Sequence, residues 1–162
     1  MLAGAALPSS ADLGKAEGRC RPHETGPSLL VEISGLKDRR GRLKVELYPD
    51  NDSDFLQDDN VLVAAGKIFR RVEADIPAAG PIELCIRSPA AGVVALSVLH
   101  DRNADGKFSF SVDGVGFGGN PRLRLSKPPA AAAAVRVGAG PTRTRVILNY
   151  RRGLLAFGPT GR

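Results

Sequence analysis

Short segments in which apolar and polar residues alternate are the main pattern along this chain. Alternation with a period of two residues is typical of strands with one buried face, and turns rich in glycine, proline and charged residues separate the segments. The first two segments, joined by the polar turn at 35–41, are expected to form a hairpin. The fourth leaves almost no polar face, which favours a central strand. The five clearest segments are Ser28–Ser34, Gly41–Tyr48, Ile82–Arg87, Gly92–His100 and Thr142–Tyr150.

Weaker segments complete the expected fold. A third strand is predicted over 67–74 and weak strands at 122–125 and 135–137, whereas 101–120 has the composition of a long glycine-rich loop. About seven short strands with frequent turns indicate an all-β fold, an antiparallel β-sandwich of immunoglobulin-like or prealbumin-like type. The 162 residues suffice for one such domain, expected at 20–150. Residues 1–19 are interpreted as a remnant signal peptide or a disordered arm, and 151–162 as a basic flexible tail.

The N-terminal segment and the two cysteines both indicate export. Residues 1–11 are mostly apolar and end in Ser9-x-Ala11, which resembles the end of a secretory signal and its cleavage site. Cys20 and Cys85 fit one disulfide, which would stabilise the fold by roughly 3 to 5 kcal/mol in an oxidising compartment. Two unrelated buried thiols are the alternative. No other stretch is long enough to span a membrane, so a periplasmic or secreted protein is expected.

Positive charge is concentrated near the end of the chain. Nine Lys or Arg and no acid lie between Pro121 and Arg162, and the net charge is +6. Such asymmetry can indicate an anionic partner. Aromatic residues that would stack on bases are missing around these arginines, so nucleic acid is not expected. Two interpretations stay open: solvated strand faces, or binding of an anionic envelope polymer through Arg136, Arg143, Arg145, Arg151 and Arg152.

The segment after the central strand has the residue spacing of a metal-binding loop. Oxygen side chains at positions one, three and five, a glycine at six and a main-chain carbonyl at seven are typical of a calcium loop. Position twelve is Val112 instead of Glu, and Asp113 supplies a carboxylate if the loop bulges. We expect at most a weak Ca²⁺ site, with a dissociation constant on the order of 0.1 to 1 mM. The alternative is an Asx-turn hairpin without a metal. The residues at these positions are Asp101, Asn103, Asp105, Gly106 and Lys107.

Several runs of the sequence resemble the hallmark of a bacterial family catalogued as domain of unknown function 2141 (DUF2141). The resemblance covers about residues 20–150, including a cysteine at each of positions 20 and 85. It implies an exported β-sandwich and no established activity. Ser109 and Gly118-Gly119 stand where relatives usually carry Asp and Ser-Asn, and these differences weaken the metal interpretation. The runs are Gly41–Asp50, Val98–Lys107 with its His-Asp-x-Asn-x-Asp-Gly-Lys pattern, and Gly114–Asn120.

Two classes of function follow from these features. The first is a non-catalytic module of the cell envelope that binds an envelope protein, another partner or a carbohydrate-like ligand, with loop calcium adding rigidity. The second is a hydrolase in which His100 and Asp101 act as acid and base, which needs a third catalytic group near His100. The sequence has no GxSxG motif, so no catalytic residue is assigned. His100, Phe117 and Asn120 remain the ligand-binding candidates.

Overall fold

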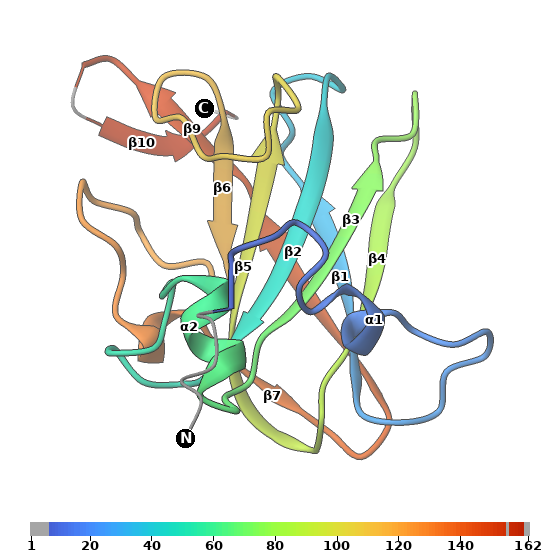
Figure 1. Ribbon diagram of the computed structural model, residues 1–162. Coiled ribbons are helices and arrows are strands. Elements are labelled where there is room, and N and C mark those ends of the chain that lie inside the picture. The colour runs from blue at the N-terminus through green and yellow to red at the C-terminus, as the bar shows by residue number, and fades with distance from the viewer. Residues whose placement is uncertain (1–6, 155, 161–162) are drawn as a thin grey trace.

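The alternating segments form two β-sheets packed face to face in the computed structural model, which describes residues 7–154 and 156–160 (Figure 1). The small sheet has the order β4-β1-β8, with β1 antiparallel to β4 and parallel to β8. The large sheet has the order β10-β9-β6-β5-β2-β3, and β7 also pairs with β5. The expectation of an all-β sandwich is therefore confirmed. The strands are β1 (Ser28–Ser34), β2 (Arg42–Tyr48), β3 (Arg70–Asp75), β4 (Ile82–Arg87), β5 (Gly92–Asp101), β6 (Gly114–Phe117), β7 (Ala134–Val137), β8 (Pro141–Ile147), β9 (Asn149–Arg152) and β10 (Ala156–Pro159).

The main core lies between the sheets and follows from the alternation. Every second residue of β1 and β2 is directed inward, and the central strand β5 contributes its own apolar row. Burial of such a row is the dominant favourable term in folding. The fully or almost fully buried side chains of these three strands are Leu29, Val31, Ile33, Leu43, Val45, Leu47, Val94, Leu96 and Val98.

A second core covers part of the outer face of the large sheet. Helix α2 (Asp59–Ala64) and the 3₁₀ turn η1 (Ala130–Ala133) cover the sheet here, and α2 lies in front of it in Figure 1. Aromatic rings dominate the contacts, with the ring centroid of Tyr48 5.6 Å from that of Phe55 and 5.4 Å from that of Phe69. The rest of this outer face is left open above α2.

The segment before β1 lies against the domain. Ser9 Oγ donates to Asp59 at 2.6 Å, and Arg71 donates to the main-chain carbonyl of Ser10 at 2.9 Å. Helix α1 (Lys15–Gly18) then packs beside β3. A disordered arm is therefore the wrong interpretation for residues 7–19. The signal-peptide interpretation stays a prediction, and residues 1–6 lie outside the described residues.

The predicted disulfide is confirmed. Cys20 and Cys85 are bonded across a sequence separation of 65 residues, with their Cα atoms 5.9 Å apart. Cys85 lies on β4, so the bond ties the N-terminal segment to the small sheet. Within the described ranges, no helix is long and apolar enough to cross a membrane.

The predicted hairpin of the first two strands is wrong. β1 and β2 belong to different sheets, and residues 35–41 carry the chain from one sheet to the other. Gly41 has φ +74°, and a Cβ there would overlap the carbonyl of Asp101, so the crossing requires glycine. Alternation with a period of two predicts which face of a strand is buried. It does not predict whether two such strands pair in one sheet or face each other from two sheets, because an apolar face is buried in both cases.

The last third of the chain also differs from expectation. The single strand predicted over 142–150 is two strands, β8 and β9, one in each sheet. Strand β6 lies within the expected glycine-rich loop, and 122–125 is not a strand. Residues 151–160, expected as part of a flexible tail, include the end of β9 and the whole of β10, which pair with each other.

Candidate functional site

His100 is a buried structural residue at the end of β5. Its side chain has no exposed surface, Nδ1 lies 2.5 Å from the hydroxyl of Tyr150, and Nε2 lies 2.7 Å from the carbonyl of Arg40. A carbonyl only accepts, so Nε2 carries the hydrogen and Nδ1 accepts from Tyr150. Burial lowers the pKa of His100, although the Arg40 carbonyl and the nearby Asp38 oppose that shift. The imidazole is therefore neutral with both nitrogens occupied.

Asp101 closes the turn that follows β5. One of its oxygens accepts the N–H of Asp105 at 3.2 Å, and the other accepts the N–H of Gly106 at 2.7 Å. Ala104 and Gly106 both have positive φ, +56° and +83°, so the chain doubles back around the Asp101 carboxylate. Asp105 in turn accepts the N–H of Lys107 at 2.9 Å. This is the Asx-turn pattern, in which carboxylates organise the backbone of a tight loop.

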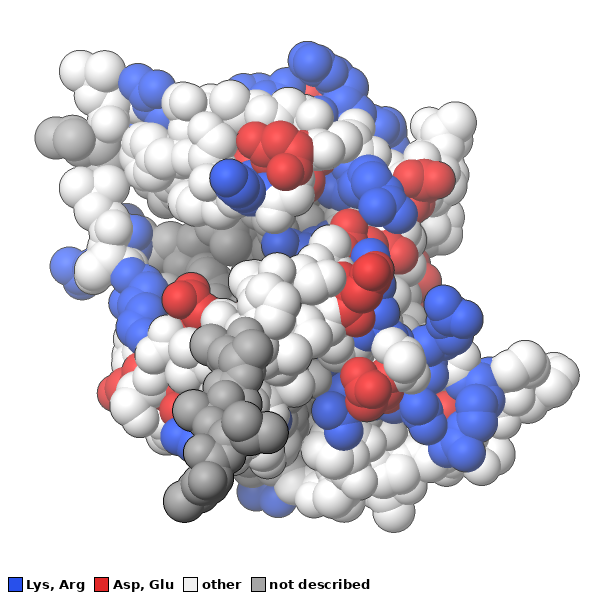
Figure 2. All heavy atoms as spheres, viewed as in Figure 1, with Lys and Arg blue, Asp and Glu red and all other residues white. Residues whose placement is uncertain are grey.

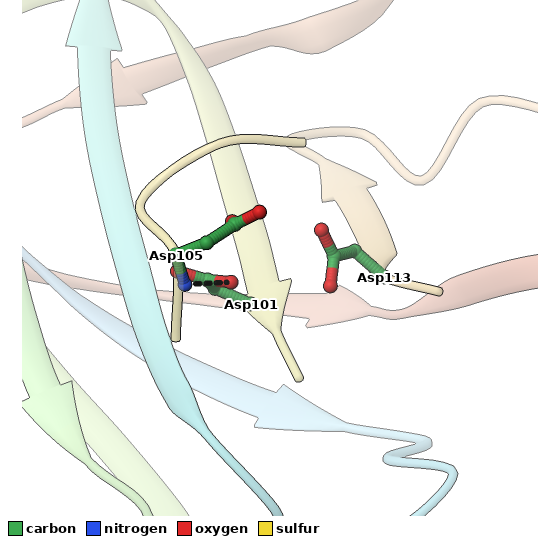
Figure 3. Close-up of side chains that lie close together, drawn as sticks. All are labelled: Asp101, Asp105 and Asp113. Atoms are coloured by element: carbon green, nitrogen blue, oxygen red, sulfur yellow. Dashed lines mark hydrogen bonds between the residues drawn. The ribbon is translucent and has the colours of Figure 1, made fainter. Parts of the chain in front are cut away.

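Asp113 completes a cluster of three carboxylates. It is 1% exposed and accepts two main-chain N–H groups, from Arg102 at 2.9 Å and from Ser109 at 2.8 Å. One oxygen from each of Asp101, Asp105 and Asp113 lies within 4.8 Å of the others. Figure 3 shows Asp113 facing the other two from across the loop. The structure therefore brings together three of the predicted ligands, including the one that required the loop to bulge.

The other two predicted ligands lie beside this cluster. The amide of Asn103 donates to Asp105 at 3.3 Å, and Asn103 is exposed. Lys107 contributes its N–H to the turn, as described above, and it too is exposed. Carboxylate, amide and carbonyl oxygens are the ligands that Ca²⁺ takes in proteins, six to eight at a time.

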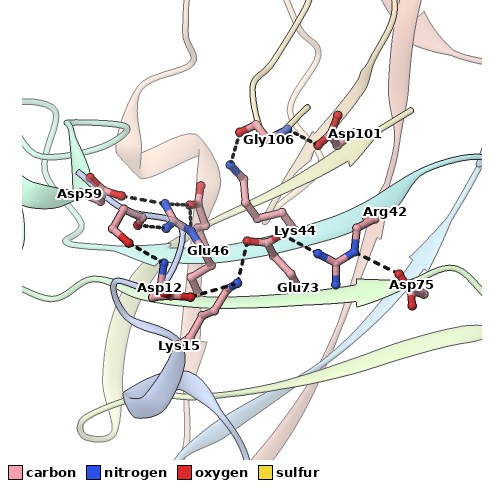
Figure 4. A network of polar contacts seen from close by, with 12 residues as sticks. Asp12, Lys15, Arg42, Lys44, Glu46, Asp59, Glu73, Asp75, Asp101 and Gly106 are labelled. Atoms are coloured by element: carbon pink, nitrogen blue, oxygen red, sulfur yellow. Dashed lines mark hydrogen bonds and ion pairs between the residues drawn. The ribbon is translucent and has the colours of Figure 1, made fainter. Parts of the chain in front are cut away.

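The three carboxylates differ electrostatically from other acids on this side of the molecule. Glu46 and Asp59, for example, which are labelled in Figure 4, both pair with Arg71, at 2.8 Å and 3.1 Å. No described Lys or Arg side chain comes within 4.0 Å of a carboxylate of the cluster. Burial, followed by the charges of Asp113 and Asp105, raises the pKa of Asp101 against the lowering effect of its two N–H donors. The cluster thus has no direct ion pair among the described residues, although Arg102, which pairs with Asp38, is near enough to Asp113 for their charges to interact.

A groove beside the Asp101–Asp113 loop was not predicted from the sequence. Its volume is about 340 Å³, and it lies over the open half of the outer face of the large sheet. The floor comes from β2, β5 and β6, and the walls come from Leu56, from the loops 102–113 and 118–129 and from β10. Figure 2 shows the hollow at the left of the molecule. Its main apolar side chains are Leu99, Phe108, Phe110, Leu123, Leu125 and Phe157.

The rim of the groove exposes large apolar residues. Phe108 is 50% exposed and Leu125 is 63% exposed. The ring of Phe157 lies 5.0 Å from that of Phe110 and 6.0 Å from that of Phe108, between ring centroids, so β10 closes one end. Contiguous exposed apolar surface of this kind marks binding sites more often than isolated apolar residues do. Phe108-Ser-Phe110 and Leu123-Arg-Leu125, apolar pairs within polar loops, were the signals that could have indicated it.

Comparison with known proteins identifies the family of this chain. A family model described as an uncharacterized protein conserved in bacteria (DUF2141) matches residues 31–145. The chain belongs to the DUF2141 family. The match runs from within β1 to Arg145 in β8, and it includes the carboxylate cluster and the floor of the groove. No curated protein and no solved structure matches the chain.

Two further candidates have structural roles in this DUF2141 member. Asn120 accepts the N–H of Ile147 at 2.8 Å and donates to the carbonyl of Arg145 at 3.0 Å, so it ties the chain to β8. Phe117 is 5% exposed and packs against Phe55 in the second core, while part of it reaches the groove. The amide of Asn120 is therefore occupied by the backbone of β8, and Phe117 can offer a ligand only apolar contact.

The C-terminal arginines are spread over three strands. Arg143 and Arg145 on β8 pair with Glu83 at 2.7 Å and Glu32 at 3.3 Å. Arg151 and Arg152 on β9 bond main-chain carbonyls of their own hairpin. Arg136 lies on β7. This distribution favours solvated strand faces over one continuous surface for an anionic polymer.

Proposed function

We propose that this chain is a non-catalytic ligand-binding module of the cell envelope, exported to the periplasm or secreted. The groove of about 340 Å³ carries this proposal. Small-molecule sites are typically concave, mostly apolar and about 300 to 1,000 Å³ in volume, often with a few polar groups at defined positions. The disulfide supports an oxidising compartment, because such bonds persist in exported proteins and are rare elsewhere.

The state of His100 favours binding over hydrolysis. A general base must reach the proton that it removes, whereas His100 is fully buried and bonds Tyr150 and Arg40 through its two nitrogens. The described residues that line the groove include no histidine and no cysteine. The hydrolase interpretation therefore lacks an accessible base at the one concave apolar site described above.

The carboxylate cluster supports a second part of the proposal, a weak calcium site. Asp101, Asp105 and Asp113 would supply the charged ligands, with Asn103 and the main-chain carbonyl of Lys107 as neutral ones. The spacing within 4.8 Å and the lack of a direct ion pair to any described Lys or Arg favour a hard cation. The hydrogen bonds of Asp101 also suit a turn without metal, so the thermal measurements described in the Discussion decide between the two.

Binding of a neutral environment-sensitive dye, Nile red, tests the groove. We expect saturable fluorescence enhancement with one dye per chain, weakened in a variant carrying Phe108→Ser and Leu125→Ser. Both side chains are at least half exposed, so their loss should leave the fold intact. Val61→Ser, which changes a side chain that is 48% exposed on α2, is the matched control and should bind as the unmodified protein does. Dye binding that the double variant leaves unchanged would contradict the proposal.

A further inference from the structure

The charged residues that line the groove are mainly basic. Lys44, Arg124 and Lys127 line it together with one acid, Glu46. Glu46 is 7% exposed, pairs with Arg71 at 2.8 Å and accepts a hydrogen bond from Tyr48 at 2.9 Å. Arg71 also pairs with Asp59 at 3.1 Å, so it balances the charge of Glu46 only in part. The lining therefore combines an apolar interior with three cations and one acid, and Asp101, Asp105 and Asp113 of the neighbouring loop are not part of it.

The close contacts of these cations do not neutralise their charge. Lys44 Nζ donates to the carbonyl of Gly106 at 3.2 Å, and Figure 4 shows the side chain reaching toward that loop. Lys127 Nζ donates to the carbonyls of Asp52 and Phe55 at 3.1 Å and 2.7 Å. Arg124 is exposed. Main-chain carbonyls carry no net charge, so the positive charge remains available to an anion in the groove.

The basic residues come from two sides of the groove. Lys44 rises from β2 in the sheet, whereas Arg124 and Lys127 belong to the loop 118–129. In Figure 2, Lys and Arg side chains lie beside the hollow on the side of this loop and at the opposite edge, with acidic side chains among them. A ligand with a charged end and an apolar body would satisfy both features, because the body displaces water from the apolar side chains and the charged end stays near the cations.

We infer that the groove binds a long-chain carboxylate, with the alkyl chain against Leu99, Phe108 and Leu125 and the carboxylate near Lys44 and Arg124. This inference rests on the proposed function, since it names the ligand class of the same groove. A neutral sugar fits less well, because a sugar needs hydrogen-bonding partners along its whole length and the lining is mostly aliphatic and aromatic. A cationic amphiphile is disfavoured by the three basic residues.

Isothermal titration calorimetry with decanoate tests the inference. The titration is made in EDTA, which prevents precipitation of the calcium salt and separates this question from that of the loop. Decanoate should bind more tightly than decyl maltoside or decyltrimethylammonium. It should also bind on the order of tenfold more tightly than octanoate, because two more methylenes are buried. Lys44→Met and Arg124→Met should each weaken decanoate binding roughly threefold to fivefold and leave decyl maltoside unchanged.

Arg136→Met on β7 is the matched control and should have no effect, since Arg136 does not line the groove. Equal affinity for all three head groups would refute the carboxylate inference and leave the binding module standing. Failure of every amphiphile and of Nile red to bind would refute the proposed function itself. A concentration-dependent dimer in sedimentation velocity that Leu125→Ser abolishes would also refute the inference, by showing that a second copy of the chain occupies the groove.

Discussion

Neutralising Asp105 should stabilise the protein without calcium and should lose that advantage when calcium is present. Asp105→Asn removes one of three neighbouring negative charges and retains an oxygen that can accept the N–H of Lys107, as the carboxylate does at 2.9 Å. The new amide can donate to the Asn103 side chain. The loop should therefore keep its conformation, so that the effect reports the charge.

The expected size follows from the geometry of the cluster. At 4.8 Å, two unit charges in water repel by about 0.9 kcal/mol, and salt at physiological strength roughly halves this value. Asp105 has two such neighbours, so its neutralisation should stabilise the metal-free protein by about 1 kcal/mol. For a domain of this size, that corresponds to a rise of about 2 to 4 °C in Tm.

Calcium should remove this difference in stability between the two proteins. A cation present at ten times its dissociation constant and bound only to the native state adds about 1.4 kcal/mol, or roughly 3 to 6 °C. The unmodified protein should gain this increment in about 5 mM Ca²⁺, given the affinity typical of weak extracellular sites. Asp105→Asn loses a charged ligand and should lose most of the gain.

Differential scanning calorimetry of the oxidised protein, in EDTA and then in Ca²⁺, measures both changes. Asp50→Asn, an exposed acid outside the cluster, is the charge-matched control and should respond to calcium as the unmodified protein does. The reasoning fails if Asp105→Asn lowers Tm in EDTA, or if calcium leaves the unmodified protein unchanged. Either result would reduce the loop to a turn in which the carboxylates serve only the backbone.

Two further predictions concern the groups that hold the loops at this end of the sandwich. Tyr150→Phe removes the hydroxyl that donates to His100 Nδ1 and should destabilise the protein by about 1 to 3 kcal/mol, measured by urea unfolding. Nitrogen NMR of the unmodified protein should show neutral His100 with the hydrogen on Nε2, and an imidazolium at neutral pH would contradict this assignment. Asp38→Asn should destabilise by up to about 1 kcal/mol near pH 7, because hydrogen bonds from Arg102 lower the pKa of Asp38. A carboxyl with a depressed folded-state pKa contributes stability above its unfolded pKa, so the difference between the two proteins should vanish as the pH falls through the folded value; a constant difference down to about pH 2 would contradict it.

Regular alternation explains why several strands could be predicted from the sequence. β1, β4 and most of β5 match the expected segments because their buried faces repeat every second residue. Strand β6 was not predicted, because two of its four residues are glycine. A Cβ on Gly114 would overlap the ring of Tyr150, and one on Gly116 would overlap Val146. These glycines are required by close packing, although glycine in a sequence usually indicates a turn.

The loop and the groove differ in how far they could be predicted. Asp101, Asn103 and Asp105 lie close together in the sequence, and their spacing predicts a turn that gathers oxygens. The groove combines residues of β2, β5, β6, β10 and three loops, so no local pattern describes it. Only the pairing order of the large sheet brings these segments to one face.

The same loop forms the carboxylate cluster and one wall of the groove, which links the two proposed sites. Asp113 accepts the N–H groups of Arg102 and Ser109. Along the chain, Phe108 lies between Arg102 and Ser109, and Phe110 lies between Ser109 and Asp113. A cation that holds Asp101, Asp105 and Asp113 together restricts the backbone that carries both rings. If ligand binding needs that same restricted wall, the cation lowers the entropy lost on binding, and the ligand must strengthen cation binding by the same factor. The arrangement therefore requires that any calcium effect on decanoate affinity be matched by an equal decanoate effect on calcium affinity.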